Sequence, residues 1–258
     1  MYNGIFCEFH TVNLVLDLGN TQHKCAVFEN DQIVFVWKKE QLTWEDLESI
    51  FQKFQISNTI LSSVDQHDPK LEEILQKNRK FLLLDPNTPL PINNAYATPE
   101  TLGNDRLAAA VGANAQFRDK NVLIIDAGTC IKYDFVNAEN VYLGGAISPG
   151  LNMRLMAMHN FTARLPLIDP LQESGIENIK LTGDTTHTSM ISGTYTGALF
   201  ESSGMIEAYA SKYADLTVIT TGGDAHFFEL HLKRQIFALP NLVLEGLNTI
   251  LNFNLNHN

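Results

Sequence analysis

The stretch of residues 13–24 reads NLVLDLGNTQHK. Its apolar start predicts a strand that ends at Asp17, and the alternation after residue 23 predicts a strand that returns beside it. Gly19 has no Cβ and lets backbone N–H groups approach an anion, Thr21 adds a donor, and Asp17 offers a hard oxygen to hydrated Mg²⁺. The hairpin therefore suits a phosphate, although a Gly-Asn turn between strands also occurs without any ligand.

The same pattern returns later in the chain. Residues 121–135 read NVLIIDAGTCIKYDF, again an apolar strand, an Asp-x-Gly-Thr turn and a returning strand, with Asp126 placed 109 residues after Asp17. Residues 217–225 read TVITTGGDA, a strand that ends in a glycine pair where a helical pattern begins. The two hairpins indicate an internal duplication, and the three turns together predict three contacts with an anion or a nucleotide.

These motifs resemble those of a known superfamily. The two Asp-x-Gly loops and the Thr-Gly-Gly at 221–223 are similar to the phosphate and adenosine motifs of the acetate kinase, Hsp70 and actin superfamily. Within it, DLGNTQHK at 17–24, GNDR at 103–106 and DAGT at 126–129 together resemble type III pantothenate kinase, from about residue 13 to about residue 225.

The resemblance implies the architecture. We expect an α/β protein of two duplicated ribonuclease H-like domains, the actin-like ATPase fold, with a nucleotide cleft between them. The expected domains are residues 1–118 and residues 119–258.

Composition narrows the class of protein. With 258 residues and 45% hydrophobic content, the chain has ample material for one large core or two smaller ones. A net charge of −11 without any cluster of Lys and Arg argues against a nucleic-acid partner.

Three cysteines without Cys-x-x-Cys spacing suggest neither a disulfide framework nor a zinc site. No apolar run reaches the length of a membrane span, and the first ten residues do not resemble a signal peptide. We therefore expect a cytoplasmic protein with no membrane partner, and residues 1–12 receive no role.

Strands and helices alternate in the first hundred residues. The patterns predict a strand at 31–37, a helix opened by the cap Thr43, a strand at 58–64, a helix at 69–77 and a strand at 80–84. This order is typical of a mostly parallel α/β arrangement. The face of the first helix that we expect to be buried carries Trp44, Leu47, Ile50, Phe51 and Phe54.

A Pro- and Asn-rich loop at 85–100 leads into Gly103-Asn104-Asp105-Arg106 and an Ala-rich helix through Phe117. A helix cap alone accounts for Asn104 or Asp105, but capping does not require the neighbouring Arg106. An Asp beside an Arg suits a substrate with a hydroxyl and a carboxylate, because Asp accepts the hydroxyl proton while the Arg fork holds the carboxylate.

The resemblance assigns roles to individual residues. Asp105 matches the general base, and Tyr96, otherwise a half-buried loop aromatic, matches a pantothenate contact. Asp17 would hold Mg²⁺ through water, and Asp126 matches the ligand of a monovalent cation, K⁺ or NH₄⁺. The implied pantothenate site consists of Tyr96, Gly103, Asn104, Asp105, Arg106 and Thr186. The implied ATP site consists of Asp17, Leu18, Gly19, Asn20, Thr21, Gln22, His23, Lys24, Thr129, Gly222 and Gly223.

Two of these assignments compete with plainer interpretations. A Lys in a hairpin, such as Lys24, is usually a solvated surface charge. Thr185 or Thr186 opens a long predicted helix that reaches about Tyr213, so either one suits a helix cap. Small residues along this helix would let a neighbouring helix or a second subunit approach closely, and the resemblance supplies a homodimer.

The implied reaction transfers the γ-phosphoryl group of ATP to the terminal hydroxyl of pantothenate. The product is 4′-phosphopantothenate, and this is the first step of coenzyme A biosynthesis. One departure from the family is visible: Cys130-Ile131-Lys132 stand where members often have smaller or hydroxylated residues. Nucleotide contacts beyond Thr129 are therefore left unassigned.

Rival interpretations use the same loops. Another small-molecule kinase of the superfamily, for a sugar or acetate, would keep the nucleotide loops but would need its own substrate loop in place of residues 103–106. A polyphosphate hydrolase would need water as its acceptor. A non-catalytic regulatory relative would be expected to lose Asp17 or Asp105, and both are present.

Overall fold

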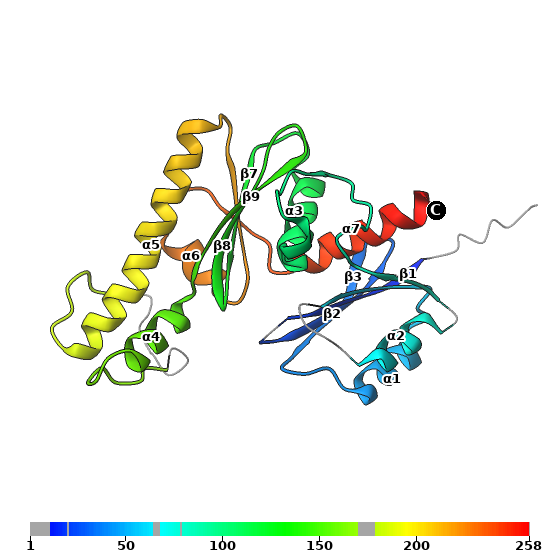
Figure 1. Ribbon diagram of the computed structural model, residues 1–258, viewed down its shortest axis with the longest axis horizontal. Helices are drawn as coiled ribbons and strands as arrows, with labels where there is room; N and C mark the ends of the chain where they lie inside the picture. The colour runs from blue at the N-terminus through cyan, green and yellow to red at the C-terminus, as the bar shows by residue number, and fades with distance from the viewer. Residues whose placement is uncertain (1–10, 20, 64–67, 78, 170–178, 258) are drawn as a thin grey trace, which may run out of the picture. The chain divides into compact units, whose positions relative to one another are not determined.

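The computed structural model describes residues 11–19, 21–63, 68–77, 79–169 and 179–257 (Figure 1). The chain divides into two compact units, one of residues 1–91, 98–112 and 243–258 and the other of residues 92–97 and 113–242. The C-terminal residues thus belong with the first unit. The boundary expected at residue 118 stays a prediction.

The first unit is built on a five-stranded mixed sheet with strand order β3-β2-β1-β4-β5. Its strands are β1 (Val12–Leu18), β2 (His23–Glu29), β3 (Gln32–Lys39), β4 (Asn58–Ser63) and β5 (Lys80–Leu83). Its helices are α1 (Trp44–Lys53), α2 (Pro69–Gln76), the 3₁₀ helix η1 (Pro99–Thr101), most of α3 (Asn104–Gln116) and most of α7 (Leu242–His257).

The second unit contains a six-stranded mixed sheet with strand order β11-β10-β7-β8-β9-β6. Its strands are β6 (Asn93–Asn94), β7 (Val122–Ala127), β8 (Cys130–Val136), β9 (Val141–Pro149), β10 (Thr217–Thr221) and β11 (Phe237–Ala238). Its helices are α4 (Leu151–Asn160), α5 (Thr186–Lys212) and α6 (Ala225–His231).

The duplication expected from the two hairpins is present in the sheets. In the first, β1 pairs antiparallel with β2 and parallel with β4, and β3 and β5 continue the sheet outward. In the second, β7 pairs antiparallel with β8 and parallel with β10, β9 and β11 take the places that correspond to β3 and β5, and β6 lies beyond β9. Each Asp-x-Gly hairpin therefore lies at the centre of its own sheet, at the end of a buried strand.

Alternation along β1 directs its side chains to two different layers. Leu14 and Leu16 join a core with Leu47 of α1 and Leu75 of α2. On the opposite face, Asn13 donates a hydrogen bond to Asn248 of α7 at 2.8 Å. Figure 1 shows α1 and α2 on one side of this sheet and α7 on the other. Asp17 shares the α7 face because it lies four residues beyond Asn13.

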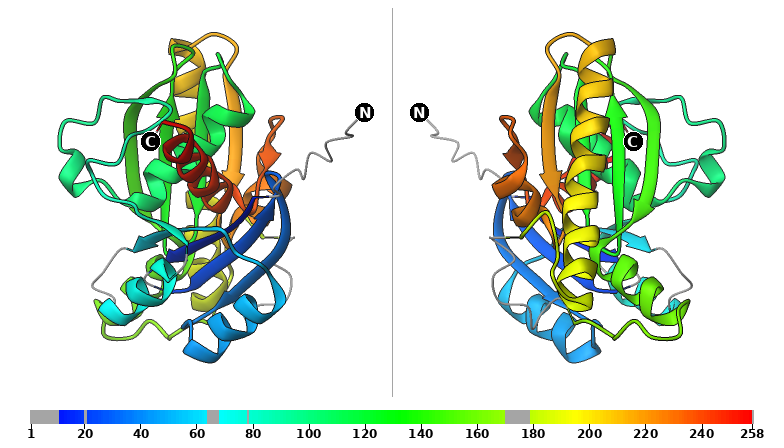
Figure 2. Two further views of the ribbon diagram at one scale, coloured as in Figure 1. Left: turned by 90° about the vertical axis from the view of Figure 1, so that its right-hand side faces the viewer. Right: turned by 90° about the vertical axis from the view of Figure 1, so that its left-hand side faces the viewer.

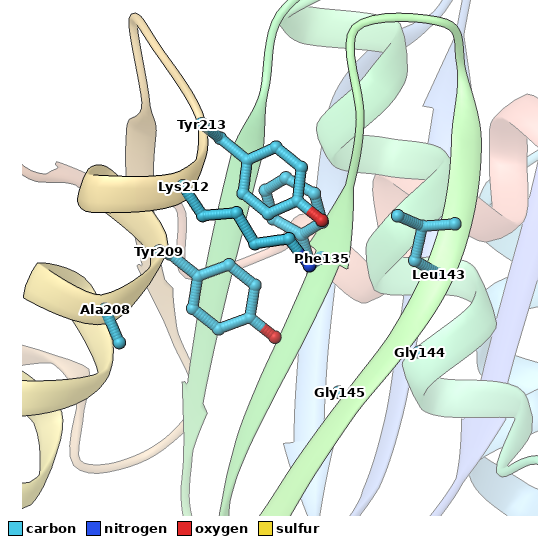
Figure 3. Close-up of a pocket in the computed structure, with 8 residues that line it drawn as sticks. All are labelled: Phe135, Leu143, Gly144, Gly145, Ala208, Tyr209, Lys212 and Tyr213. Carbon is cyan, nitrogen blue, oxygen red and sulfur yellow. The ribbon is translucent and has the colours of Figure 1, made fainter.

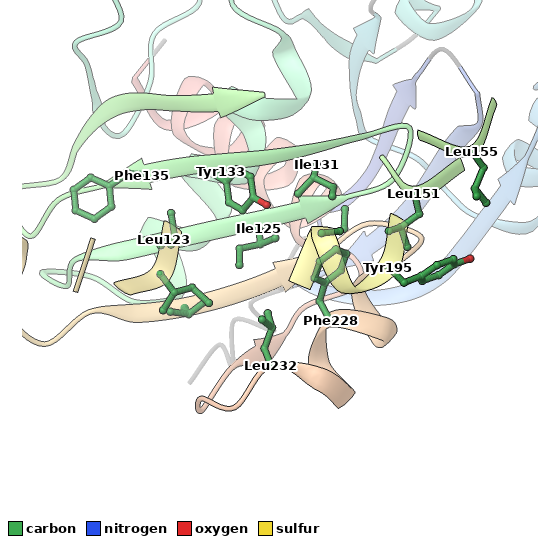
Figure 4. Close-up of a cluster of buried hydrophobic side chains, with 14 of the residues drawn as sticks. Leu123, Ile125, Ile131, Tyr133, Phe135, Leu151, Leu155, Tyr195, Phe228 and Leu232 are labelled. Carbon is green, nitrogen blue, oxygen red and sulfur yellow. The ribbon is translucent and has the colours of Figure 1, made fainter. Parts of the chain in front are cut away.

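The core of the second unit lies between the sheet and its helices. Figure 2 shows α5 running along one face of the sheet. Figure 4 shows Ile125 and Tyr133 of the central strands together with Tyr195 of α5 and Phe228 of α6 in one apolar cluster. This packing buries the strands of the β7–β8 hairpin and leaves Thr129 in its turn exposed.

Two local predictions were wrong, and both failures have a physical cause. Trp44 is 39% exposed, because it is the first residue of α1 and extends beyond the packed turns that bury Leu47 and Ile50. The loop at 85–100 contains the short strand β6, which pairs with β9 across a long sequence separation. The strand predicted at 58–64 is described through Ser63; Val64 lies outside the described residues.

Candidate functional site

Asp17 lies where β1 ends, directly opposite Lys24 of β2. Its side chain is buried, 5% exposed, and accepts a hydrogen bond from Ser62 Oγ at 3.2 Å. A Cβ at Gly19 would lie 3.1 Å from the carbonyl oxygen of Gln22, so the turn is narrow at its first residue. A fixed carboxylate beside a tight turn can hold a hydrated cation and a phosphate together.

Not every residue of this hairpin presents a side chain to a ligand. Leu18 is 7% exposed and packs in the core of the first unit, so only its backbone is available. His23 Nδ1 accepts a hydrogen bond from the backbone N–H of Leu42 at 3.0 Å, and burial lowers the pKa of its ring. Thr21 and Gln22 are exposed, and Asn20, predicted as an ATP contact, lies outside the described residues.

Asp105 stands in the first turn of α3, as predicted from the sequence. Its Oδ1 accepts a hydrogen bond from the backbone N–H of Arg106 at 2.9 Å and would lie only 2.6 Å from a Cβ at Gly103. The Asp105 carboxylate thus lies against Gly103, where a larger residue would collide with it. Asn104 Nδ2 donates to the carbonyl oxygen of Leu84 at 3.1 Å, which connects this turn to the residue that follows β5. Arg106 is buried, 5% exposed.

In the second unit, Asp126 lies at the end of β7, directly opposite Lys132 of β8. The Nζ of Lys132 lies 2.6 Å from Oδ2 of Asp126, and the two side chains are only 17% and 13% exposed. Gly128 N donates to the carbonyl oxygen of Cys130 at 2.9 Å, which closes the turn and leaves Thr129 exposed at its tip. No role for Lys132 was predicted from the sequence. The register of the β7–β8 hairpin explains why it pairs with Asp126.

The Thr-Gly-Gly turn packs against this hairpin. Thr221 of β10 pairs with Asp126, and Gly222 has a φ of +93°. A Cβ at Gly222 would lie 2.2 Å from the carbonyl oxygen of Ala127 and 2.6 Å from Oδ1 of Asp126. A Cβ at Gly223 would meet nothing within 4 Å. The structure therefore brings Asp126 and Gly222 into direct contact and leaves the backbone at Gly223 open.

Two predicted pantothenate contacts lie elsewhere in the second unit. The ring of Tyr96 stacks on Tyr142 at a centroid distance of 6.2 Å and lies against Gly144. Thr185, and not Thr186, is the N-terminal cap of α5: its side chain accepts from the Thr188 backbone N–H, and the Thr188 side chain accepts from the Thr185 backbone N–H. Thr186 follows the cap and is exposed.

A polar network that the sequence did not reveal connects α4, α5 and the end of β9. Glu201 accepts hydrogen bonds from Ser148 Oγ at 3.0 Å and Tyr133 Oη at 2.9 Å, and it forms an ion pair with Arg154. Arg154 Nε also donates to the carbonyl oxygen of Pro149 at 2.9 Å. Burial would raise the pKa of Glu201, but the hydrogen bonds that it accepts outweigh burial and lower it. Because these residues are distant in sequence, no local motif marks the network.

A pocket of about 460 Å³ lies in the second unit between the sheet and the end of α5 (Figure 3). Phe135, Tyr209, Tyr213 and Lys212 line it, together with Ala208 and residues 143–145. It contains none of the residues predicted to bind ATP or pantothenate. The residues predicted to bind ATP and pantothenate therefore lie outside this pocket.

Single carboxylates are the candidate metal ligands of the described site. In the described ranges, no three His, Cys, Asp or Glu side chains gather into a group that could hold a metal ion. Mg²⁺ bound with a nucleotide uses one or two carboxylates, several waters and the phosphates, so the single carboxylate of Asp17 is enough to hold it. A free monovalent cation fits Asp126 poorly, because the ammonium of Lys132 is already at its carboxylate.

None of the helices in the described parts of the chain combines the length and the apolar character that a membrane span needs.

Comparison with known proteins gives a consistent result. A family profile described as "Type III pantothenate kinase" matches residues 13–208. A type III pantothenate kinase of Christiangramia forsetii is 48% identical over 246 residues, which cover 94% of this chain and 99% of the relative. One from Bacteroides fragilis is 43% identical over 244 residues, which cover 94% of this chain and 98% of the relative.

Solved structures show the same fold at low sequence identity. A putative Baf family transcriptional activator from Campylobacter jejuni has a TM-score of 0.57 at 22% identity, covering 94% of this chain and 99% of that chain. The activator of 2-hydroxyisocaproyl-CoA dehydratase from Clostridium difficile has a TM-score of 0.54 at 13% identity, covering 96% and 97%. A ROK family glucokinase from Streptomyces griseus has a TM-score of 0.53 at 13% identity, covering 94% and 99%. These neighbours establish the actin-like ATPase fold and nothing further about the site.

Proposed function

The chain belongs to the type III pantothenate kinase family, and we propose which of its residues carry out the ATP-dependent phosphorylation of pantothenate. Kinases of this family catalyse the first step of coenzyme A biosynthesis. The observation that carries the proposal is the duplicated hairpin, in which an Asp at the end of a buried strand faces a Lys across the strand pair. Phosphoryl transfer is catalysed mainly by positioning and charge neutralisation, and each hairpin offers both.

We assign the phosphates of ATP to the turns of the two hairpins and the adenosine end to Gly222 and Gly223. The backbone N–H groups of the two hairpin turns and the Thr21 and Thr129 hydroxyls would donate hydrogen bonds to phosphate oxygens. Asp17 would hold Mg²⁺ through water, and the ion would neutralise charge on the transferred group. Ser62 supports this role because its Oγ donates a hydrogen bond of 3.2 Å to Oδ1 of Asp17 and so orients the carboxylate.

Asp105 is the proposed general base. Its carboxylate would accept the proton of the terminal hydroxyl of pantothenate as that oxygen attacks the γ-phosphorus of ATP. Arg106 would hold the carboxylate of pantothenate, because charge-assisted hydrogen bonds gain strength where water is excluded. Gly103, Asn104, Tyr96 and Thr186 complete the proposed substrate site.

A homodimer is part of the same proposal. Gly193, Gly197, Phe200 and Gly204 recur on one face of α5, and Phe200 is 66% exposed. Within the described residues, a Cβ built at each of these glycines would meet nothing within 4 Å. Phe200→Glu should shift the protein toward monomer in sedimentation experiments. The cytoplasmic location remains a prediction.

The substrate assignment is tested by the choice of acceptor. Purified protein with Mg²⁺ and ATP should convert pantothenate to its 4′-phosphate, identified by mass spectrometry, and should leave glucose and acetate unmodified. Pantothenol, which lacks the carboxylate, should be a poorer acceptor, and Arg106→Met should reduce the preference for pantothenate over pantothenol. Transfer to glucose or acetate at a comparable rate would point to another kinase of the superfamily.

A further inference from the structure

We infer that Lys132 supplies, as a permanent part of the chain, the positive charge at Asp126 that other family members take from K⁺ or NH₄⁺. This inference rests on the proposed nucleotide site and specifies how that site is charged. It predicts a kinase whose binding of ATP does not depend on a monovalent cation.

The strand register makes the Lys132–Asp126 pair an intrinsic feature of the hairpin. Lys132 and Asp126 are directly opposed on β8 and β7, so their side chains leave the same face of the sheet. The Nζ–Oδ2 distance is 2.6 Å, and both side chains are more than four-fifths buried. Burial limits competition from solvent, so the ammonium stays at the carboxylate.

The Asp126 carboxylate lies between Lys132 and the turn at Gly222. Oδ2 contacts the Lys132 ammonium, and Oδ1 faces Gly222, where an added Cβ would be only 2.6 Å away. A free cation at Oδ2 would have to displace the ammonium or stand beside a like charge. Either arrangement is unfavourable, because like charges repel strongly where little water screens them.

An ammonium group can take the place of the ion chemically. It carries the same single charge as K⁺, and it interacts with the same carboxylate and phosphate oxygens, through hydrogen bonds in place of coordination. Because Lys132 is tethered to the hairpin, its local concentration does not depend on the salt in solution. The first hairpin provides an internal comparison, since Lys24 stands opposite Asp17 in the same way.

The test measures ATP binding by calorimetry, without pantothenate, in potassium chloride and in tetramethylammonium chloride of equal ionic strength. Wild-type protein should bind ATP with the same dissociation constant in both salts, to within about twofold. Lys132→Met keeps the aliphatic stem and removes the charge. It should weaken binding at least about tenfold in tetramethylammonium, and potassium should restore most of the loss.

Two further variants serve as controls. Lys132→Arg keeps the charge and should remain independent of potassium, whereas Lys120→Met removes an exposed charge in a turn of the same unit and should bind as the wild type does. Thermal unfolding of each variant shows whether it is folded.

Wild-type binding that weakens when potassium is removed would overturn the inference and leave the proposed function intact. So would a folded Lys132→Met protein that potassium does not restore. Failure of the wild type to bind ATP in either salt would overturn the proposed function itself, and the inference with it.

Discussion

The ring of Tyr96 lies so close to Gly144 that a Cβ at Gly144 would stand 2.9 Å from Cδ2 of the ring. Gly144 also has a φ of +89°, a backbone conformation that residues other than glycine rarely adopt. The pairing of β6 with β9 brings these two residues together. A glycine in one strand thus sets the position of an aromatic ring that is assigned to the substrate.

Gly144→Ala should therefore displace Tyr96. We expect KM for pantothenate to rise several-fold, with kcat and the affinity for ATP little changed, because the lost contact is remote from the transferred phosphoryl group. Tyr96→Ala should reproduce this change in steady-state kinetics. If Gly144→Ala altered ATP binding instead, the ring would have a different role.

The glycine pair at residues 222–223 offers a matched comparison. Gly222→Ala places a Cβ 2.2 Å from the Ala127 carbonyl oxygen at a φ of +93°, and we expect it to lose roughly 2–4 kcal/mol of unfolding free energy. Gly223→Ala meets nothing within 4 Å and should unfold like the wild type. It should nevertheless weaken ATP binding, because its Cβ would enter the space assigned to adenosine.

Urea titration and calorimetry separate the two effects. Equal destabilisation by both substitutions, or unchanged ATP affinity in Gly223→Ala, would refute this account of the turn.

Glu201 should make stability depend on pH. Its pKa is lowered in the folded protein by hydrogen bonds that outweigh burial, so its ionised form favours folding. This stabilisation is complete well above the unfolded pKa of about 4.3 and is lost as pH falls through the lower folded pKa. Glu201→Gln should cost about 1–2 kcal/mol at pH 7, and the difference from wild type should shrink below about pH 4. A difference that did not change with pH, measured by urea denaturation, would contradict the proposed ionisation.

A chain of asparagines joins the C-terminal helix to the first strand. Asn13 donates to Asn248 at 2.8 Å and to Asn252 at 2.9 Å, and it accepts from Asn58 at 2.8 Å. Asn13→Ala would remove the hydrogen bonds that the Asn58 Nδ2 group donates and that the Asn248 and Asn252 Oδ1 atoms accept, and we expect a loss of roughly 2–4 kcal/mol of unfolding free energy. Asn256→Ala, on the exposed side of α7, should be nearly neutral in the same denaturation experiment.

Local pattern was sufficient to predict much of the fold and the local geometry of part of the candidate site. The hairpins at Asp17 and Asp126 combine a buried strand with a glycine turn, and such signals lie within a dozen residues. The Thr43 cap of α1 was likewise confirmed, with Asp46 completing its reciprocal hydrogen bonds. Long-range relations were not predictable in this way.

The β6–β9 pairing involves two residues on each strand and carries almost no sequence signal, yet it positions Tyr96. The Glu201 network joins residues 47 to 68 positions apart. Lys132 belongs to the hairpin pattern that the sequence predicted, but only the strand register shows that it stands opposite Asp126. The duplication was predicted from one repeated motif, and the matching strand orders of the two sheets extend it to five strands in each unit.

The role of Asp105 is tested most directly by comparing wild type with Asp105→Asn in two measurements, ATP binding and phosphoryl transfer to pantothenate. The amide keeps the shape of the carboxylate but cannot accept the hydroxyl proton. We predict an affinity for ATP within about threefold of wild type and a rate of transfer at least about 100-fold lower. Transfer within tenfold of wild type, or a loss of ATP binding that accounts for the lower rate, would contradict the assignment of Asp105 as the general base.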